Sequence, residues 1–581
     1  MLQLPRAIAD LPSRFRSSLT KVDALPQLSL LAVLIGTFTG LLIVCFRVAL
    51  EAPAIFFPIS SAERFEELAP LTRVNLILSG TLLIALALYY LNPKQRQMSV
   101  GHVIDRLHNF QGRLPATNWV AQFFLCILSI CSGQSVGREG PAIHLGAGAA
   151  SHVGKWLRLP NNSMHTMIAC GVAAGISASF DTPLAGVIFA MEVIVMEYSI
   201  VGFVPVILSS VIAAAICKSI LGEAVAFDVA NISMNSLSEL GIVIAAGLAL
   251  GCMASLYIRL NIWTIRFQQK SILLRVLIAG VITAAVSVYV PEIMGLGYDT
   301  IQETIDGKLV VGTVLFIAVA KLLVTPIVVG LGMPGGLIGP SLFVGACAGF
   351  AFAVAADHMF PGLNVDSGFY VLLGMTGMFA AVINAPLAGL VAILELSHNP
   401  NIIFPSMLLI CIACLTTRHI FHLKGIFTEQ LEHSGRTLNF GPAEMALKKV
   451  GVMSIMNRNY IETRASIHIE EAKDILQKKP DWIVYRESEV ICLNASDLAN
   501  FIESNEDASD SNIELAEIPA RRFLLDMVRD TDTLYDAWLT LQNSKKQTMY
   551  VTSHYSGKNN ILGILTLEAI KAYYQPKISK G

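Results

Sequence analysis

One acidic residue stands between two glycines, in a stretch too apolar for water, at Gly137-Arg138-Glu139-Gly140-Pro141. The proline suits the first turn of a helix, and the small apolar residues at 142–150 predict that helix. A helix N-terminus presents unpaired N–H groups and partial positive charge, so an anion is its natural partner. The carboxylate of Glu139 would lie at the same place. We therefore expect Glu139 and a mobile anion to compete for one site.

The same helix start occurs twice in the chain, and so does a second motif. The first motif is a Gly-Pro pair followed by a small-residue helix, at 140–149 and 339–348. The second is Pro-Leu-Ala-Gly with a glutamate six residues beyond the glycine, at 183–192 and 386–395. The copies are 199 and 203 residues apart and keep the same order. This predicts two homologous halves whose broken helices meet near the middle of a membrane, as in transporters.

Each Gly-Pro start follows a glycine-rich break, at 132–137 and 330–338. Two positive helix ends could therefore converge on one anion. The alternative is that these glycines only permit close packing of helices in lipid. For Glu192 and Glu395 two interpretations stay open: they cap, pair or face water, or they take part in ion movement.

Composition places these elements in a membrane. Of the 581 residues 54% are hydrophobic and only 14% are charged, with a mean hydropathy of +0.60. Apolar runs that approach the length of a membrane span lie at 28–50, 71–91, 204–221, 240–258 and 273–290. The net charge of −2 gives no case for nucleic acid. No Ser/His/Asp, metal-spaced His/Cys or phosphate-loop pattern occurs, so we expect neither an enzyme nor a metal site.

The chain divides into three regions by composition. Residues 1–26 are polar and carry four basic residues, so we interpret them as an interfacial segment with a cytoplasmic N-terminus. Residues 27–440 form an α-helical polytopic membrane domain, with halves at about 27–220 and 237–435. Residues 441–581 alternate helix and strand patterns and predict a small α/β soluble domain.

Three stretches together resemble the signature sequences of the CLC family of chloride channels and H⁺/Cl⁻ exchangers. They are Gly137-Arg138-Glu139-Gly140-Pro141, Phe180-Asp181-Thr182-Pro183-Leu184-Ala185-Gly186 and Met333-Pro334-Gly335-Gly336-Leu337-Ile338-Gly339-Pro340. The resemblance extends over about residues 27–435. It implies an inverted repeat of tilted, partly spanning helices, in a homodimer with one anion pathway per subunit. It also implies a bacterial inner membrane with both termini cytoplasmic.

The resemblance also implies roles for residues of this chain. Glu139 is then the gate, whose carboxylate blocks the pathway when ionised and swings away when protonated or displaced. Backbone amides from Arg138 to Gly140 and from Leu337 to Gly339 would line the chloride sites. Transport should consequently increase in acid.

Several positions depart from the family pattern. The family's anion-binding serine falls at Met98 here, with Ser99 as its neighbour, and the family's inner tyrosine is replaced by Phe427. Ile338 stands where a phenylalanine is common. Without hydroxyl donors at two of these positions, we expect weak central binding or altered selectivity.

Position 193 bears on the mechanism. Exchangers of this family generally have a glutamate directly after the one that matches Glu192, and it relays protons; here the residue is Val193. Valine carries no proton, so the sequence favours a passive, gated chloride channel, with a proton-coupled H⁺/Cl⁻ antiporter as the alternative. Transport of another anion, fluoride or nitrate, is a further alternative, against which Pro141 argues because fluoride exchangers tend to alter that residue.

The C-terminal region resembles a CBS-domain pair, with helix, strand, strand and helix twice over, from about 450 to 503 and 520 to 574. In that family a Ser/Thr and an Asp three residues later often hold a nucleotide's ribose. The matching positions are Asn494 with Asp497, and Thr566 with Ala569. A structural, dimerising module is the expectation, and an adenine nucleotide as ligand is the alternative.

Overall fold

In the computed structural model of the chain, the described residues are 19 and 24–574, with gaps at 57–59, 62–63, 199, 223–226, 228–232, 235, 364, 437–440, 505–511 and 554–559. They form two compact units, a larger one with residues 28–156 and 165–438 and a smaller one that includes residues 157–164 and 439–581. The predicted interfacial segment 1–26 lies almost entirely outside the described residues.

The larger unit is helical throughout. Its first half comprises α3 (Leu25–Leu50), α4 (Ala52–Phe56), α5 (Pro70–Tyr90), α6 (Val100–Asn109), α7 (Ala116–Cys131), α8 (Glu139–Trp156), α9 (Asn161–Phe180), α10 (Pro183–Phe189) and α11 (Ile200–Leu221). Its second half comprises α12 (Leu240–Ile265), α13 (Ile272–Ser287), α14 (Tyr298–Ile305), α15 (Val311–Gly330), α16 (Ile338–Met359), α17 (Ser367–Ile383), α18 (Pro386–Ser397), α19 (Ile403–Leu415) and α20 (Ile426–His433). Prolines open α5, α10 and α18 because the first helical turn needs no N–H there.

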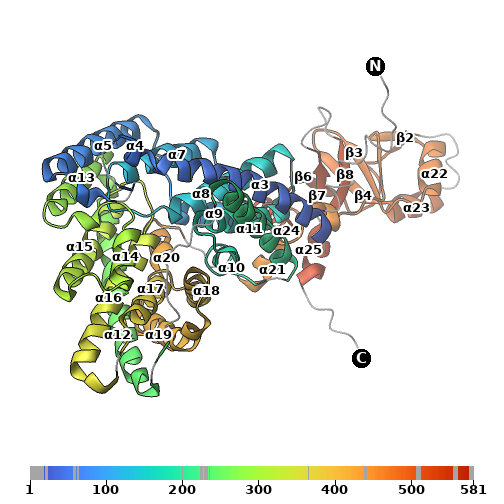
Figure 1. Ribbon diagram of the computed structural model, residues 1–581. Coiled ribbons are helices and arrows are strands. Elements are labelled where there is room, and N and C mark those ends of the chain that lie inside the picture. The colour runs from blue at the N-terminus through green and yellow to red at the C-terminus, as the bar shows by residue number, and fades with distance from the viewer. Residues whose placement is uncertain are drawn as a thin grey trace. The chain divides into compact units, whose positions relative to one another are not determined.

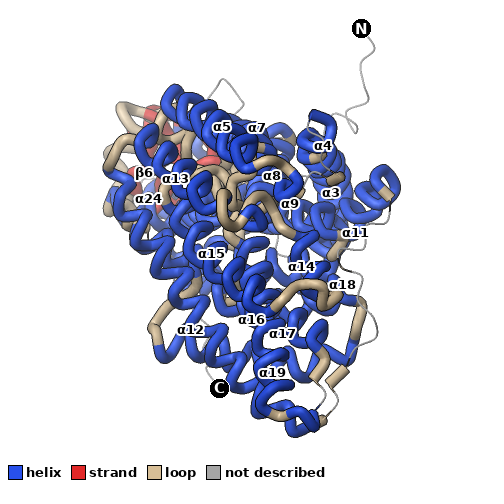
Figure 2. The backbone as a smooth tube through the Cα atoms, turned by 60° about the vertical axis from the view of Figure 1, so that its left-hand side comes forward, coloured by secondary structure: helices blue, strands red, loops and turns tan. Residues whose placement is uncertain are grey.

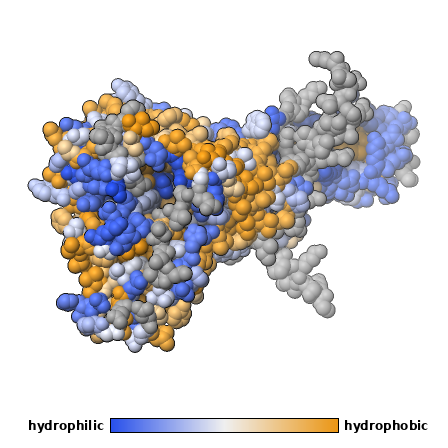
Figure 3. Space-filling model, viewed as in Figure 1, coloured by the Kyte–Doolittle hydropathy of each residue, from blue (hydrophilic) through white to orange (hydrophobic). Residues whose placement is uncertain are grey.

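This unit has the surface of a membrane protein. Eight of its described helices are long and apolar enough to cross a bilayer. Large apolar side chains are exposed on them, among others Leu82, Val281 and Phe316, and Figure 3 shows apolar surface over much of this part of the chain. Together with the length of these helices, such extended apolar surface is typical of contact with lipid or with another chain in a membrane.

The internal repeat predicted from the sequence is visible in the packing. A Cβ on Gly146 of α8 would lie 2.0 Å from the carbonyl oxygen of Gly171 on α9, and one on Gly345 of α16 would lie 2.3 Å from that of Gly374 on α17. Each helix that follows a break therefore packs backbone to backbone on the next helix, at equivalent glycines. Figure 2 shows α15, α16 and α17 as neighbours in the second half.

The smaller unit contains a six-stranded mixed sheet in the order β1-β3-β4-β6-β7-β8, flanked by helices (Figure 1). The sheet strands are β1 (Tyr460–Thr463), β3 (Trp482–Arg486), β4 (Val490–Asn494), β6 (Phe523–Arg529), β7 (Thr548–Thr552) and β8 (Ile561–Thr566). A separate ribbon pairs β2 (Ser466–His468) with β5 (Asn512–Glu514). The helices are α21 (Pro442–Lys448), α22 (Ile469–Gln477), α23 (Ala495–Ser504), α24 (Leu534–Ser544) and α25 (Leu567–Tyr574).

The twofold pattern predicted for this unit is confirmed. In each half a helix precedes an antiparallel pair, β3 with β4 or β7 with β8, and a second helix follows. The sequence did not indicate the leading strands β1 and β6, which pair in parallel with β3 and β7. Each half has its own apolar core, one around Ile483 and Leu498 and the other around Met549 and Leu565.

Candidate anion and proton site

The two glycine-rich breaks meet. The N–H of Gly137 donates to the carbonyl of Gly336 at 2.8 Å, and the N–H of Gly336 donates to the carbonyl of Gly137 at 2.7 Å. Beside this bridge, a Cβ on Gly140 would lie 3.1 Å from Cα of Gly336. The bridge brings the N-termini of α8 and α16 to one place, and the glycines allow the backbones to approach so closely.

Glu139 lies in the first turn of α8, but its side chain reaches the other half. Its carboxylate accepts hydrogen bonds from the N–H of Gly339, at 2.9 Å, and from the hydroxyl of Tyr298, at 2.5 Å. The residue is 1% exposed. Because Gly339 belongs to the first turn of α16, the carboxylate occupies the anion-binding end of that helix.

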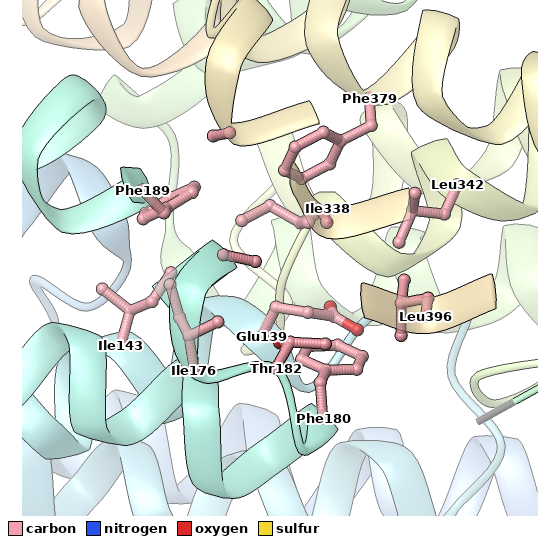
Figure 4. Close-up of a pocket in the computed structure, with 13 residues that line it drawn as sticks. Glu139, Ile143, Ile176, Phe180, Thr182, Phe189, Ile338, Leu342, Phe379 and Leu396 are labelled. Carbon is pink, nitrogen blue, oxygen red and sulfur yellow. The ribbon is translucent and has the colours of Figure 1, made fainter. Parts of the chain in front are cut away.

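A small cavity of about 40 Å³ adjoins this carboxylate, enough for a few water molecules or one small anion. Figure 4 shows Glu139 between Ile338 on one side and Thr182 and Phe180 on the other. The remaining lining is almost wholly apolar and includes Ile143, Ile176, Phe189, Leu342, Phe379 and Leu396. Apolar walls strengthen the interaction of any charge here with the helix end, because little water screens it.

Tyr298 was not identified from the sequence. It is the first residue of α14, directly after Gly297, whose φ of +81° turns the chain into the helix. The buried Lys321 donates to the carbonyls of Gly295 and Leu296, at 3.4 and 3.2 Å, and so holds this turn in place. No motif marks a tyrosine that lies 159 residues from its partner.

The side chain of Arg138 lies against two aromatic rings near Glu139, those of Phe180 and Tyr298. Its guanidinium carbon lies 5.2 Å from the ring centre of Phe180 and 5.0 Å from that of Tyr298. Both are within cation–π distance. The positive charge of Arg138 therefore lies on the ring whose hydroxyl bonds Glu139.

The other predicted anion contacts divide between two cavities. Ile338 lines the small cavity with Glu139, whereas Met98 and Ser99 line a second, polar cavity of about 530 Å³. Ser99 is the N-cap of α6, yet its side chain makes no capping hydrogen bond. Phe427 is buried in the first turn of α20 and lines neither cavity.

Leu337 precedes α16, and its carbonyl accepts a hydrogen bond from Tyr257 at 3.1 Å. Gly339 contributes its N–H to Glu139, as described above, while Gly140 packs on Gly336. The structure thus brings together Glu139, Gly140, Ile338 and Gly339.

Glu192 and Glu395 cap each other's helices. The carboxylate of Glu192 accepts from the N–H groups of Leu387 and Ala388 at the start of α18, at 3.2 and 2.7 Å. The carboxylate of Glu395 accepts from Leu184 and Ala185 at the start of α10, at 2.9 and 2.7 Å. Of the two interpretations left open by the sequence, this geometry fits capping, because both oxygens of each side chain bond a helix N-terminus.

Val193, the predicted departure on the proton route, is 6% exposed and lies in a π-helical turn that continues α10, at Ala190–Val195. Glu192 lies in the same turn. Both oxygens of Glu192 serve the cap, and Val193 holds no proton. Neither residue offers a free titratable group at this place.

In the smaller unit, the hydroxyl of Thr566 accepts from the N–H of Ala569 at 3.1 Å and so serves the start of α25. Asn494 ends β4, opposite Trp482, and Asp497 lies in the first turn of α23. Among the described residues, no group of three or more metal-ligating side chains occurs. A nucleotide at these positions stays a prediction.

Two related halves that meet at a buried carboxylate between broken helices define a membrane transporter. The family model of the voltage-gated chloride channels matches residues 80–418, more than half of the chain. The chain therefore belongs to the CLC family of chloride transport proteins, as its signature stretches predicted.

Curated relatives and solved structures extend the likeness beyond this match. The chain is 29% identical over 435 residues to the H⁺/Cl⁻ exchange transporter ClcA of Salmonella agona (strain SL483), covering 72% of this chain and 90% of the relative. The ClcA of Klebsiella pneumoniae (strain 342) is 28% identical over 436 residues, with the same coverage.

Among solved structures, a slow cyanobacterial Cl⁻/H⁺ antiporter superposes with a TM-score of 0.62 at 21% identity, over 70% of this chain and 97% of that one. A CLC-type fluoride/proton antiporter gives 0.59 at 20% identity, over 70% and 98%. A eukaryotic CLC transporter gives 0.57 at 17% identity, over 94% and 99%, so its likeness includes the smaller unit. These likenesses establish the fold.

Proposed function

We propose that this protein exchanges chloride for protons across a membrane, with Glu139 as the group that both ions address. The observation that carries this proposal is the carboxylate of Glu139 at the N-terminus of α16, bonded to Gly339 and Tyr298. A chloride ion that takes this place must displace the carboxylate, and a proton on the carboxylate removes the charge that competes with chloride. Chloride binding and protonation are then linked at one site.

The choice of exchange over passive conduction rests on the relatives. Val193 favours a channel, but the curated relatives with 28–29% identity are named H⁺/Cl⁻ exchange transporters. These names support the antiporter alternative better than the channel. The fluoride/proton antiporter shares the fold at 20% identity and adds no argument for fluoride as the substrate.

The assembly proposed with this function is a homodimer with one pathway in each subunit, in a bacterial inner membrane with both termini cytoplasmic. These features follow from the family resemblance. The smaller unit would then be a cytoplasmic CBS-like pair that supports the dimer.

The test is transport by the purified full-length protein in liposomes loaded with chloride, with chloride efflux and external pH recorded together. An outward chloride gradient should drive protons inward against a proton gradient, in a fixed ratio to chloride. Chloride efflux without proton movement would contradict exchange and restore the channel. Replacing chloride with fluoride or nitrate in the same vesicles tests the other anions.

A further inference from the structure

Two buried histidines lie side by side, His102 on α6 and His144 on α8, the helix that begins with Glu139. Nδ1 of His102 is 2.9 Å from Nε2 of His144, and the residues are 5% and 0% exposed. The rings are tilted by 56° with centres 5.1 Å apart. Nothing in the gating of Glu139 requires this contact.

The hydrogen-bond partners assign the protons. Nε of Arg106, which can only donate, lies 3.2 Å from Nε2 of His102, so that nitrogen accepts and the ring is neutral. The proton of His102 is then on Nδ1 and is donated to Nε2 of His144. This leaves the proton of His144 on its own Nδ1, a buried atom without a hydrogen-bond partner among the described residues. An unsatisfied buried donor calls for an acceptor from outside the protein, water or an anion.

The pair lies between a large polar cavity and the contact of the two breaks. His102 lines the cavity of about 530 Å³, together with Met98, Ser99 and Gly335. His144 follows Gly140 by one helical turn, on the same face of α8, and Gly140 packs on Gly336 of the second break. The pair therefore reaches from the lining of the cavity to α8, at a position one helical turn from the contact of the breaks.

Resting on the exchange function proposed above, we propose that His102 and His144 form a proton relay between the large cavity and Glu139. An exchanger needs a route for protons that the anion path alone does not supply. Val193 carries no proton, and both oxygens of Glu192 are held by helix N–H groups. The histidine pair has what that position lacks, since it joins a polar cavity to a donor with no hydrogen-bond partner in the described part of the chain.

The transfer conserves protons at each atom. A proton from water in the cavity binds Nε2 of His102, which gives up its bond from Arg106. The proton on Nδ1 of His102 moves to Nε2 of His144, and the proton on Nδ1 of His144 passes to water and on to the displaced carboxylate of Glu139. Both rings then carry their proton on Nε2, and each regains the Nδ1–H form before the next transfer by giving one proton to the water on its own side and taking one from it.

The charges near the pair disfavour a proton that stays on the His102 ring. Arg106 bonds His102 directly, and Arg436 faces it from the segment after α20, where it is paired with Asp105 of α6. Burial of the ring, together with two guanidinium groups against one carboxylate beside it, disfavours a lasting imidazolium.

The experiment measures chloride and proton flux of the full-length protein in liposomes for His102→Gln and His144→Gln. We expect the proton flux to fall at least about tenfold while the chloride flux stays within about twofold of wild type. The double variant should lose no more than either single variant, because the two groups act in series. His152→Gln is the matched control, since His152 is a histidine on the same helix, bonded to Trp119, and it should leave the ratio unchanged.

An unchanged H⁺/Cl⁻ ratio in both variants would overturn the relay. Equal loss of both fluxes in both variants would also overturn it and make the pair a packing element. If wild type couples the two fluxes and both variants keep its H⁺/Cl⁻ ratio, the relay is wrong but the proposed exchange function is supported. Uncoupled chloride flux in wild type would remove both.

Discussion

The two halves of the membrane unit use one design and differ at one position. Each has a glycine-rich break, a helix that packs through a glycine on its neighbour, and a Pro-Leu-Ala-Gly helix capped by a glutamate from the other half. Glu139 stands before Gly140-Pro141 in the first half, whereas the residue before the corresponding Gly339-Pro340 is Ile338. One half thus supplies the carboxylate, and the other supplies the N–H of Gly339 and the hydroxyl of Tyr298 that bond it. The two halves therefore share the packing that forms the scaffold, and the site arises where they differ, at Glu139 and Ile338.

Removing the charge that distinguishes the halves should have the largest effect. In Glu139→Gln the side chain can no longer take up a proton, so we expect proton flux to fall at least about 100-fold and chloride flux to lose its increase in acid. Paired chloride and pH recordings from pH 4 to 8 would measure this. A pH profile like that of wild type would take the gate away from Glu139.

The second-largest effect is expected from a methyl group added at Gly339, in the first turn of α16. A Cβ on Gly339 would lie 2.4 and 2.8 Å from the two oxygens of Glu139, so Gly339→Ala displaces the carboxylate. We expect chloride flux at neutral pH to rise about tenfold and to depend less on pH. Gly312→Ala, where a Cβ meets nothing within 4 Å, is the control. Fluxes that match in the two variants would contradict the observed position of Glu139.

Loss of the tyrosine hydroxyl should have a smaller effect of the same sign. Tyr298→Phe removes one of the two bonds that hold the ionised carboxylate, and we expect about threefold to tenfold more chloride flux at pH 7. At acid pH the difference should vanish, because the protonated side chain has left the site in both proteins. Tyr289→Phe, an exposed position, should match wild type at every pH.

The two reciprocal helix caps, Glu192 and Glu395, should contribute about equally to stability. Glu192→Gln and Glu395→Gln each remove a charged cap from a helix of the other half, at a cost of about 1–2 kcal/mol each. We expect similar losses in melting temperature in detergent and an unchanged H⁺/Cl⁻ ratio. A changed ratio in Glu192→Gln alone would assign that residue to the proton route.

The smallest effect is expected in the smaller unit, whose halves also differ. Asn494 is followed by Asp497 three residues on, but Thr566 by Ala569, and the Thr566 hydroxyl is engaged at the start of α25. ATP should therefore raise the melting temperature of the full-length protein by less than about 1 °C. A saturable shift of several degrees would establish nucleotide binding.

Periodicity and motif spacing predicted the repeated halves, the meeting of the breaks and the twofold α/β unit. Those features could be predicted because they depend on local runs of Gly, Pro and apolar residues, which specify helix starts and close contacts between helices. Tyr298 and Lys321 escaped prediction because their roles depend on distant partners, Glu139 in one case and the turn at Gly295 in the other. The reciprocal caps were foreseen only as one of two alternatives, since a glutamate's spacing does not say which helix its oxygens reach.

The bridge between Gly137 and Gly336 also limits how this protein can move. Transporters built from repeats commonly alternate by rocking one repeat against the other around a fixed site. Here the two repeats are joined by a reciprocal pair of backbone hydrogen bonds at the site itself, so a motion that separated the two breaks would break both bonds. Rotation of the Glu139 side chain about its own bonds breaks neither, so we expect access to change at this side chain while the bridge persists.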